Sequence, residues 1–232
     1  MTITRMNSTR LNPIERDTLW NRAYVALKSA LLAGKFAPGE KIILRQVADE
    51  LRISLTPVRD AVNRMIAEKI LERGSVGQAG GATVPLLNAD QFNQLMIVRT
   101  SLEPVAAAAA ASFATPKQLD EVEAFLSEMK RSVNENRTEQ YLKAHYQFHF
   151  GIYALCRMPV ILEIIESTWL RCGPTLTLAL PEYIPGLKRY QSHVATLDAL
   201  RCGDGEGAAT AIRADIESAR RDIVVLLENS RR

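Results

Sequence analysis

The sequence is poor in the residues that build extracellular scaffolds and membrane spans. It holds 3 Cys in 232 residues, and none of them belongs to a C-x-x-C pair. A disulfide framework or a structural zinc knot is therefore not expected, and we predict buried thiols at Cys156, Cys172 and Cys202. No run of eighteen apolar residues occurs, and residues 1–17 contain no apolar leader. These absences predict a cytoplasmic protein that has no membrane partner.

The charge is unevenly distributed, although the formal net charge is only +3. Through Pro85 there are 13 Lys and Arg against 8 Asp and Glu, whereas the remainder has 16 against 18. A basic N-terminal part followed by a mildly acidic part is typical of a DNA-binding domain joined to a sensing or pairing domain. Chance scatter of surface charge is the alternative explanation of the same counts.

The stretch from Ile53 to Leu71 predicts a recognition helix. Ser54 and Thr56 are N-cap residue types, and Pro57 suits the first turn of a helix. Apolar residues recur at three- and four-residue spacing and predict one buried stripe, made of Val58, Ala61, Val62, Met65 and Ile66. The opposite face carries Arg59, Asn63 and Arg64. With the helical pattern of residues 45–51 before it, this stretch predicts a helix-turn-helix.

The flanking segments complete a winged helix. Residues 19–31 carry a helical stripe, and residues 41–43 are typical of a short strand. Residues 70–74 and 82–85 predict two more strands around the glycine-rich loop at 74–81. Glycine allows backbone at such a loop to approach DNA closely.

No alternating strand pattern follows Pro85, and the remainder predicts an all-α bundle. Residues 106–111 are six successive alanines, which favour close helix packing. Breaks such as Gly173-Pro174 separate the segments. The predicted helices cover residues 89–113, 115–133, 139–155, 159–171, 187–201 and 206–229.

The predicted fold is therefore mostly α, with an N-terminal winged helix-turn-helix and a C-terminal helical bundle. We expect a flexible arm at 1–16, a DNA-binding domain at 17–85 and an effector-binding and dimerisation domain at 86–232. The connection at residues 85–88 is the expected hinge.

All three histidines fall in the predicted bundle. His145 and His149 are four residues apart, so they share one face of a helix and could reach one metal ion. An ordinary surface pair is the alternative interpretation. His193 and Asp215 lie on later helices and would complete a set of three imidazoles and one carboxylate. No Glu stands next to His145, as a helical zinc protease would require, which argues against a hydrolase.

The N-terminal part contains three motifs, LLAGKFAPGEKI, RQVADELRISLTPVRDAVNRMIAEKIL and GGATV. They resemble the motifs of the GntR family of bacterial transcription regulators. In the bundle, VRTSLE at residues 98–103 resembles the first helix of an FCD domain, the helical domain of FadR-type members. The short bundle is similar to the VanR-like, six-helix form of that domain.

The resemblance implies specific DNA contacts. Carried over position by position, these contacts fall on Arg45, Ser54, Thr56, Arg59 and, in the wing, Gly81. Many family members have Arg where this chain has Leu55, so base readout is expected to rest on Arg45 and Arg59.

The resemblance also implies a metal site. The family pattern is Asp-x-x-x-His on one helix, a His that opens a later helix, and another His 22 positions on. The matching residues here are His145, His149, His193 and Asp215, with Asp and His exchanged at the first and last positions. The implied cofactor is a divalent metal ion of the Zn, Ni or Mn class, with His145 either a fourth ligand or a hydrogen-bond donor.

These features predict a transcriptional regulator, not an enzyme. The expected protein is a homodimeric repressor that binds a palindromic double-stranded DNA operator and responds to a small organic acid held by the metal. Arg99, Tyr146 and Arg171 are candidates for a second anchor of that acid. The alternatives are a metal-dependent enzyme with an accessory DNA-binding domain and a structural DNA-binding protein without an effector.

Overall fold

A computed structural model describes residues 19–74, 81–179 and 190–229. Its N-terminal part contains α1 (Leu19–Leu32), β1 (Lys41–Ile42), α2 (Leu44–Leu51), α3 (Leu55–Ala67), β2 (Glu72–Arg73) and β3 (Ala82–Thr83). The strands form one antiparallel sheet in the order β1-β3-β2, so the strand expected at residues 41–43 pairs with the two strands of the wing. The winged helix-turn-helix is confirmed. The expected arm at 1–16 and the tip of the wing at 75–80 lie outside the described residues.

The predicted apolar stripes form the core of this part. Ala23, Leu27 and Leu31 of α1 are buried, and Val58 and Met65 of α3 lie in the same cluster. Arg52 ends α2 in the left-handed conformation, with φ 54°, and its N–H reaches the carbonyls of the last turn. This short connection carries the chain directly from α2 into α3.

The start of α3 differs from the prediction in one respect. Ser54 is the N-cap by position, but its side chain makes no capping hydrogen bond. Thr56 lies inside the first turn, so the prediction that both residues cap the helix was wrong. Backbone geometry and the burial of Val58 start this helix without help from either hydroxyl.

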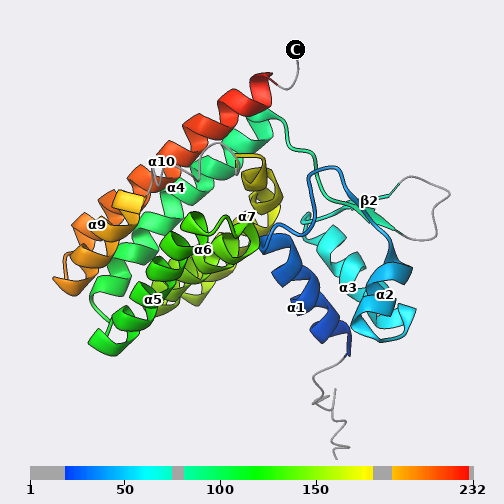
Figure 1. The fold of residues 1–232 in the computed structure, drawn as a ribbon, viewed down its shortest axis with the longest axis horizontal. Helices are drawn as coiled ribbons and strands as arrows, with labels where there is room; N and C mark the ends of the chain where they lie inside the picture. The colour runs from blue at the N-terminus through cyan, green and yellow to red at the C-terminus, as the bar shows by residue number, and fades with distance from the viewer. Residues whose placement is uncertain (1–18, 75–80, 180–189, 230–232) are drawn as a thin grey trace, which may run out of the picture.

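The C-terminal part is helical, as predicted. It contains α4 (Ala89–Ala111), α5 (Pro116–Asn134), α6 (Thr138–Tyr153), η1 (Ala154–Cys156), α7 (Pro159–Leu176), η2 (Thr177–Ala179), α9 (Tyr190–Arg201) and α10 (Gly205–Asn229). The long helices α4 and α10 lie side by side (Figure 1). The expected helix start at residue 187 lies outside the described residues.

The alanine run lies where α4 packs against its neighbours. Ala106, Ala107 and Ala110 are buried in the bundle core. At the start of α10, a Cβ on Gly205 would lie 2.9 Å from the carbonyl oxygen of Ala108. The backbones therefore approach closely, which is the packing that small side chains allow.

Two local predictions were wrong. The Gly173-Pro174 pair does not end a helix, because α7 continues to Leu176 with Pro174 inside it. Pro174 and Thr175 are buried, so tertiary packing outweighs the local cost of an internal proline. Cys202 is exposed in the turn before α10, whereas Cys156 and Cys172 are buried as expected.

Helix α1 joins the two parts. Its C-terminal end points toward the bundle (Figure 1), and it packs against α7 and α6. Lys28 of α1 pairs with Glu166 of α7, and Lys35 lies 2.9 Å from Glu139 of α6. Among the described residues, no helix combines the length and apolar character that crossing a bilayer requires.

Candidate metal centre and DNA-binding face

Three helices bring the predicted ligand residues together. His145 and His149 stand one turn apart on α6, His193 lies on α9, and Asp215 lies on α10. Each offers one ligand atom, and these four atoms all lie within 4.8 Å of one another. His149, His193 and Asp215 are buried, whereas His145 is partly exposed. The structure thus groups residues that are up to seventy positions apart in the chain.

The separations within the cluster suit a metal ion. His149 Nε2 lies 3.2 Å from His193 Nε2, and 3.6 Å from Asp215 Oδ2. His193 Nε2 lies 3.6 Å from Asp215 Oδ1. Ligands of a tetrahedral ion with bonds of about 2.0–2.1 Å are about 3.3 Å apart, so small adjustments suffice. Asp215 Oδ1 is buried and accepts no hydrogen bond from the described residues. A bound cation would compensate the cost of burying this oxygen without a partner.

The hydrogen bonds around His149 orient its ring for this task. The Tyr153 hydroxyl donates to Glu103 Oε2 at 2.7 Å and lies 3.0 Å from His149 Nδ1. A hydroxyl has one hydrogen, so Tyr153 gives it to Glu103 and accepts from the Nδ1–H of His149. Nε2 then carries a lone pair directed at the cluster. A second partner of this kind is usual for a metal-binding histidine.

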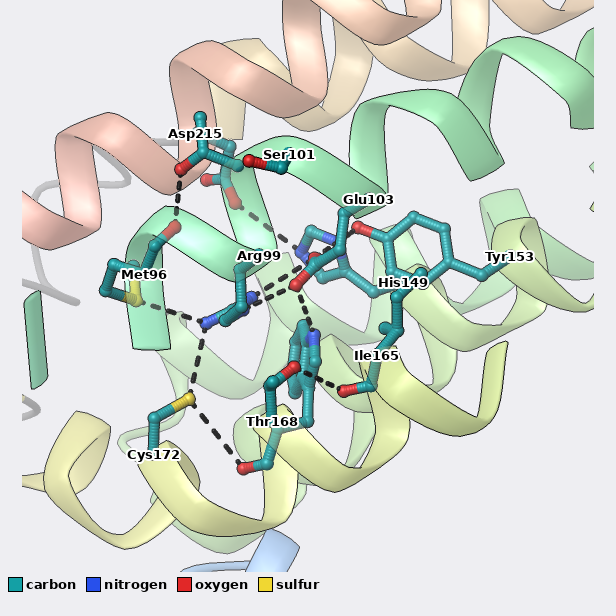
Figure 2. A network of polar contacts seen from close by, with 12 residues as sticks. Met96, Arg99, Ser101, Glu103, His149, Tyr153, Ile165, Thr168, Cys172 and Asp215 are labelled. Carbon is teal, nitrogen blue, oxygen red and sulfur yellow. Dashed lines mark hydrogen bonds and ion pairs between the residues drawn. The ribbon is translucent and has the colours of Figure 1, made fainter. Parts of the chain in front are cut away.

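Glu103 is the centre of a buried polar network (Figure 2). Its side chain is fully buried, and it accepts from Tyr153, from Trp169 Nε1 at 2.9 Å and from Arg99 Nε at 2.5 Å. Arg99 Nη2 reaches the other oxygen at 3.3 Å. One carboxylate therefore connects the cationic side chain of α4 with the histidine cluster.

Arg99 remains charged inside the bundle. Burial by itself would lower its pKa, but the attraction of Glu103 outweighs burial and raises the pKa above its ordinary value. Its guanidinium carbon lies 4.3 Å from the centre of the Trp169 ring. Within the described residues, Arg99 Nη1 donates to the sulfur atoms of Met96 and Cys172, each at 3.7 Å. These weak acceptors leave part of the guanidinium able to bind a better anion.

A cavity of about 40 Å³, here called the sensor cavity, adjoins the cluster. At about 10–15 Å³ for each water, it has room for roughly three water-sized groups. Polar groups from both the cluster and the network reach it. Its walls are Leu32, Arg99, Tyr141, Leu142, His145, Trp169, Gly173, Leu176, Asp215, Ile216, Ala219 and Ile223.

Of the three predicted anchor residues, only Arg99 lines the sensor cavity. Tyr146 faces the groove between α1 and α6, and its hydroxyl donates to Glu166 at 3.4 Å. Burial and then Glu166 raise the pKa of Tyr146. Arg171 of α7 lines another pocket, which Lys69 and Arg73 also line. Of the three alternatives that the sequence left open, Arg99 therefore remains the candidate for the second anchor.

The predicted DNA contacts lie on one part of the winged helix. Arg45 on α2 and Ser54, Thr56 and Arg59 at the start of α3 are exposed. Gly81 is half-buried at the base of the wing, where its carbonyl accepts from the Gly74 N–H at 3.0 Å.

Arg64, which the sequence also places on the exposed face of α3, has partners within the protein. Its Nε lies 2.8 Å from Glu68 Oε1, and its guanidinium lies 4.3 Å from the Tyr24 ring centre. The Tyr24 hydroxyl donates to the other oxygen of Glu68 at 2.5 Å. Arg64 thus serves the packing of α3 against α1.

The sequence analysis missed the residues that surround the cluster. Glu103 follows Arg99 at the i,i+4 spacing of a helical ion pair, and this signal was available. Tyr153 likewise follows His149 by four residues. Nothing local indicates that Trp169 and Cys172, on another helix, complete the network.

A winged helix-turn-helix followed by a helical domain with a partly polar cavity is the architecture of a DNA-binding regulator. The sequence model for bacterial regulatory proteins of the gntR family matches residues 19–79, and that for the FCD domain matches residues 94–218. The FCD match alone covers more than half of the chain. The chain therefore belongs to the GntR family of transcriptional regulators, in the FadR subfamily with a C-terminal FCD domain.

Relatives along nearly the whole chain agree with this assignment. The chain is 30% identical to the HTH-type transcriptional regulator McbR of Escherichia coli (strain K12) over 208 residues, which cover 89% of this chain and 91% of that protein. A structure of E. coli McbR/YncC superimposes with a TM-score of 0.81 at 27% identity and covers 94% of this chain and 100% of that one.

A more distant relative is the galactonate operon transcriptional repressor of E. coli (strain K12), 24% identical over 87% of this chain and 95% of that protein. These relatives are transcriptional regulators, which supports the predicted regulator over the enzyme alternative.

Proposed function

We propose that the chain is a repressor that binds a palindromic operator as a homodimer and releases it when a small organic acid binds beside a metal ion in the helical domain. The observation that carries this proposal is the cluster of His145, His149, His193 and Asp215 next to the sensor cavity and Arg99. A polar cavity of this kind favours a sensor over a purely structural DNA-binding protein. The name of the galactonate operon repressor supports the direction of control.

DNA recognition is assigned to the exposed start of α3 and its surroundings. Arg45 and Arg59 would read guanine edges in the major groove, and Ser54 and Thr56 would bind phosphate oxygens near the helix N-terminus. The Ser54 side chain is exposed and makes no capping hydrogen bond in α3, so its O–H can be directed outward at a phosphate oxygen. Gly81 would let the wing backbone approach the duplex.

We infer dimerisation from the small DNA-contacting surface of a single winged helix-turn-helix domain. A single winged helix contacts too little DNA for tight and specific binding, whereas two related by a two-fold axis reach successive major grooves. We assign DNA binding to residues 17–85, with an arm at 1–16, and effector binding and pairing to residues 86–232.

The metal is assigned to His149, His193 and Asp215, with His145 as a fourth ligand or as a hydrogen-bond donor to the acid. Imidazole nitrogens and one carboxylate suit a divalent ion of the Zn, Ni or Mn class. Such an ion would supply positive charge that attracts a carboxylate oxygen of the acid.

The acid is held by more than the metal. Arg99 lines the same cavity, and its Nη1 donates to weakly accepting sulfur atoms in the part of the chain that the structure describes, so it is placed to donate to a second oxygen of the acid. Trp169 and Ile216 offer apolar surface for the rest of the molecule. No role in acid binding is assigned to Tyr146 or Arg171.

The test begins with an operator selected from random-sequence DNA by the full chain. Elemental analysis then measures the metal content of protein purified without chelator, and thermal shift with a panel of small carboxylic acids identifies ligands. Operator affinity is compared with and without those acids in the wild type and in His149→Ala. We expect one metal per chain and acid-induced release only in the wild type. Substoichiometric metal in the wild type, together with an unchanged acid response in His149→Ala, would reject the metal-dependent mechanism.

A further inference from the structure

One wall of the sensor cavity comes from the DNA-binding domain. Leu32, the last residue of α1, lines the cavity together with residues of the bundle. It packs against the hydrophobic core of the bundle and also against that of the winged helix. A side chain of the DNA-binding domain is thus in direct reach of a bound acid.

The bundle also contributes a side chain to the core of the winged helix. Leu170 of α7 is buried in the core of the winged helix, whereas its neighbour Trp169 lines the sensor cavity. The two domains therefore exchange side chains around the cavity.

The residues at the C-terminal end of α1 are tightly packed. Gly34 has φ +71°, and a Cβ there would lie only 2.6 Å from Leu142 Cδ1 and 3.0 Å from Thr177 Cγ2. Leu142 itself lines the sensor cavity. Since close-packed elements move as units, a displacement of Leu32 would be passed to the rest of α1.

Helix α1 in turn supports the recognition helix. It packs along α3, and the Tyr24 hydroxyl donates to Glu68 just beyond the end of α3. A shift of α1 would therefore change how α3 is presented to DNA.

The size of the cavity decides which ligands can cause such a shift. With room for roughly three water-sized groups, about 40 Å³ accommodates little more than a carboxylate with one small substituent. The cavity is partly open, and its partly exposed wall residues are Leu32 from the DNA-binding domain and Tyr141, His145, Gly173 and Leu176 from the bundle. A larger acid that stays enclosed beside Arg99 must displace a wall, and Leu32 is the wall residue that belongs to the DNA-binding domain.

We propose that Leu32 transmits acid binding to the DNA-binding domain and sets the minimum size of an acid that causes release of DNA. This inference rests on the proposed acid-sensing function. Acids that fit without moving Leu32 bind without changing operator affinity. Larger acids displace Leu32 and α1, and thereby lower operator affinity.

The experiment uses the full chain loaded with Zn²⁺ and two probes of equal charge but different size, acetate and benzoate. Calorimetry measures acid binding, and a separate titration measures operator affinity. In the wild type, benzoate should weaken operator binding by about 5- to 150-fold, the usual range for coupled sites. Acetate should bind and leave operator affinity nearly unchanged.

The informative variant is Leu32→Ala, which enlarges the cavity from the side of α1. It should bind benzoate at least as tightly as the wild type, yet its operator affinity should no longer respond. Val25→Ala, on the exposed face of the same helix, is the matched control and should respond like the wild type. Leu32→Val, a milder truncation, should give an intermediate response and serves if Leu32→Ala does not fold.

The outcomes separate this inference from the function on which it rests. An equal benzoate response in Leu32→Ala and wild type would overturn the role of Leu32 while leaving the sensor intact. Loss of benzoate binding in Leu32→Ala would also overturn it, because Leu32 would then be only part of the binding surface. If neither acid binds the wild type before DNA is added, the acid-sensing function fails and this inference fails with it.

Discussion

The hydroxyl of Tyr153 lies 3.0 Å from His149 Nδ1 and stands between that histidine and Glu103. Burial, followed by the charge of Glu103, raises the pKa of Tyr153 well above its ordinary value. The hydroxyl is therefore protonated at any physiological pH, and its only hydrogen goes to Glu103. This relationship decides which nitrogen of His149 faces the proposed metal.

Tyr153→Phe should lower metal affinity by about 10- to 100-fold, as loss of a hydrogen-bond partner behind a ligating histidine typically does. The ring is retained, so the overall fold should persist. Competition with a chelating dye measures the affinity. Tyr24→Phe, which removes a comparable hydroxyl-to-carboxylate bond in the winged helix, is the control and should leave metal affinity unchanged. An equal effect of both substitutions would contradict the assigned tautomer.

Glu103→Gln should destabilise the protein by about 3–5 kcal/mol, because it leaves the buried charge of Arg99 without its counterion. Urea unfolding followed by circular dichroism measures the change. The pair Arg64–Glu68 has the same i,i+4 spacing but is partly exposed to water. Glu68→Gln should therefore cost less, and a comparable loss would show that burial of the Arg99 pair is not the deciding factor.

Arg59→Ala should weaken operator binding by about 1–3 kcal/mol if this side chain reads a base. Binding to random DNA should change little. Fluorescence anisotropy with both DNAs measures the two affinities, and Arg221→Ala, an exposed substitution on α10, controls for loss of positive charge. Equal losses on both DNAs would assign Arg59 to phosphate. Arg45→Ala is the parallel experiment.

Iodoacetamide at neutral pH should modify Cys202 in the native protein and spare the other two cysteines. Cys202 is exposed, whereas burial shields Cys156 and Cys172. Burial also raises the pKa of Cys172, although Arg99 opposes the shift, so this thiol stays protonated and unreactive at neutral pH. Mass spectrometry of tryptic peptides locates the label. Rapid native labelling of Cys172 would show that the network around Arg99 opens to solvent, and denatured protein should label at all three positions.

The sequence alone determined most of the elements and the four residues of the predicted ligand cluster. The apolar stripes of α1 and α3 specify which faces are buried, because side-chain spacing along a helix is a local property. The same spacing places His145 and His149 on one face of α6. The short turn around Arg52 likewise indicated the helix-turn-helix.

Tertiary packing decided which of these faces meet. His193 and Asp215 approach His149 only because α6, α9 and α10 all pack against α4, and no local pattern encodes that arrangement. The choice of Arg99 over Tyr146 and Arg171 as a residue of the cavity depends on how each helix is rotated against its neighbours. In the sequence, no pattern distinguishes Leu32 from other apolar residues near a helix end. It becomes a wall of the sensor cavity because α1 lies against α6 and α7, a contact made by side chains more than one hundred positions apart.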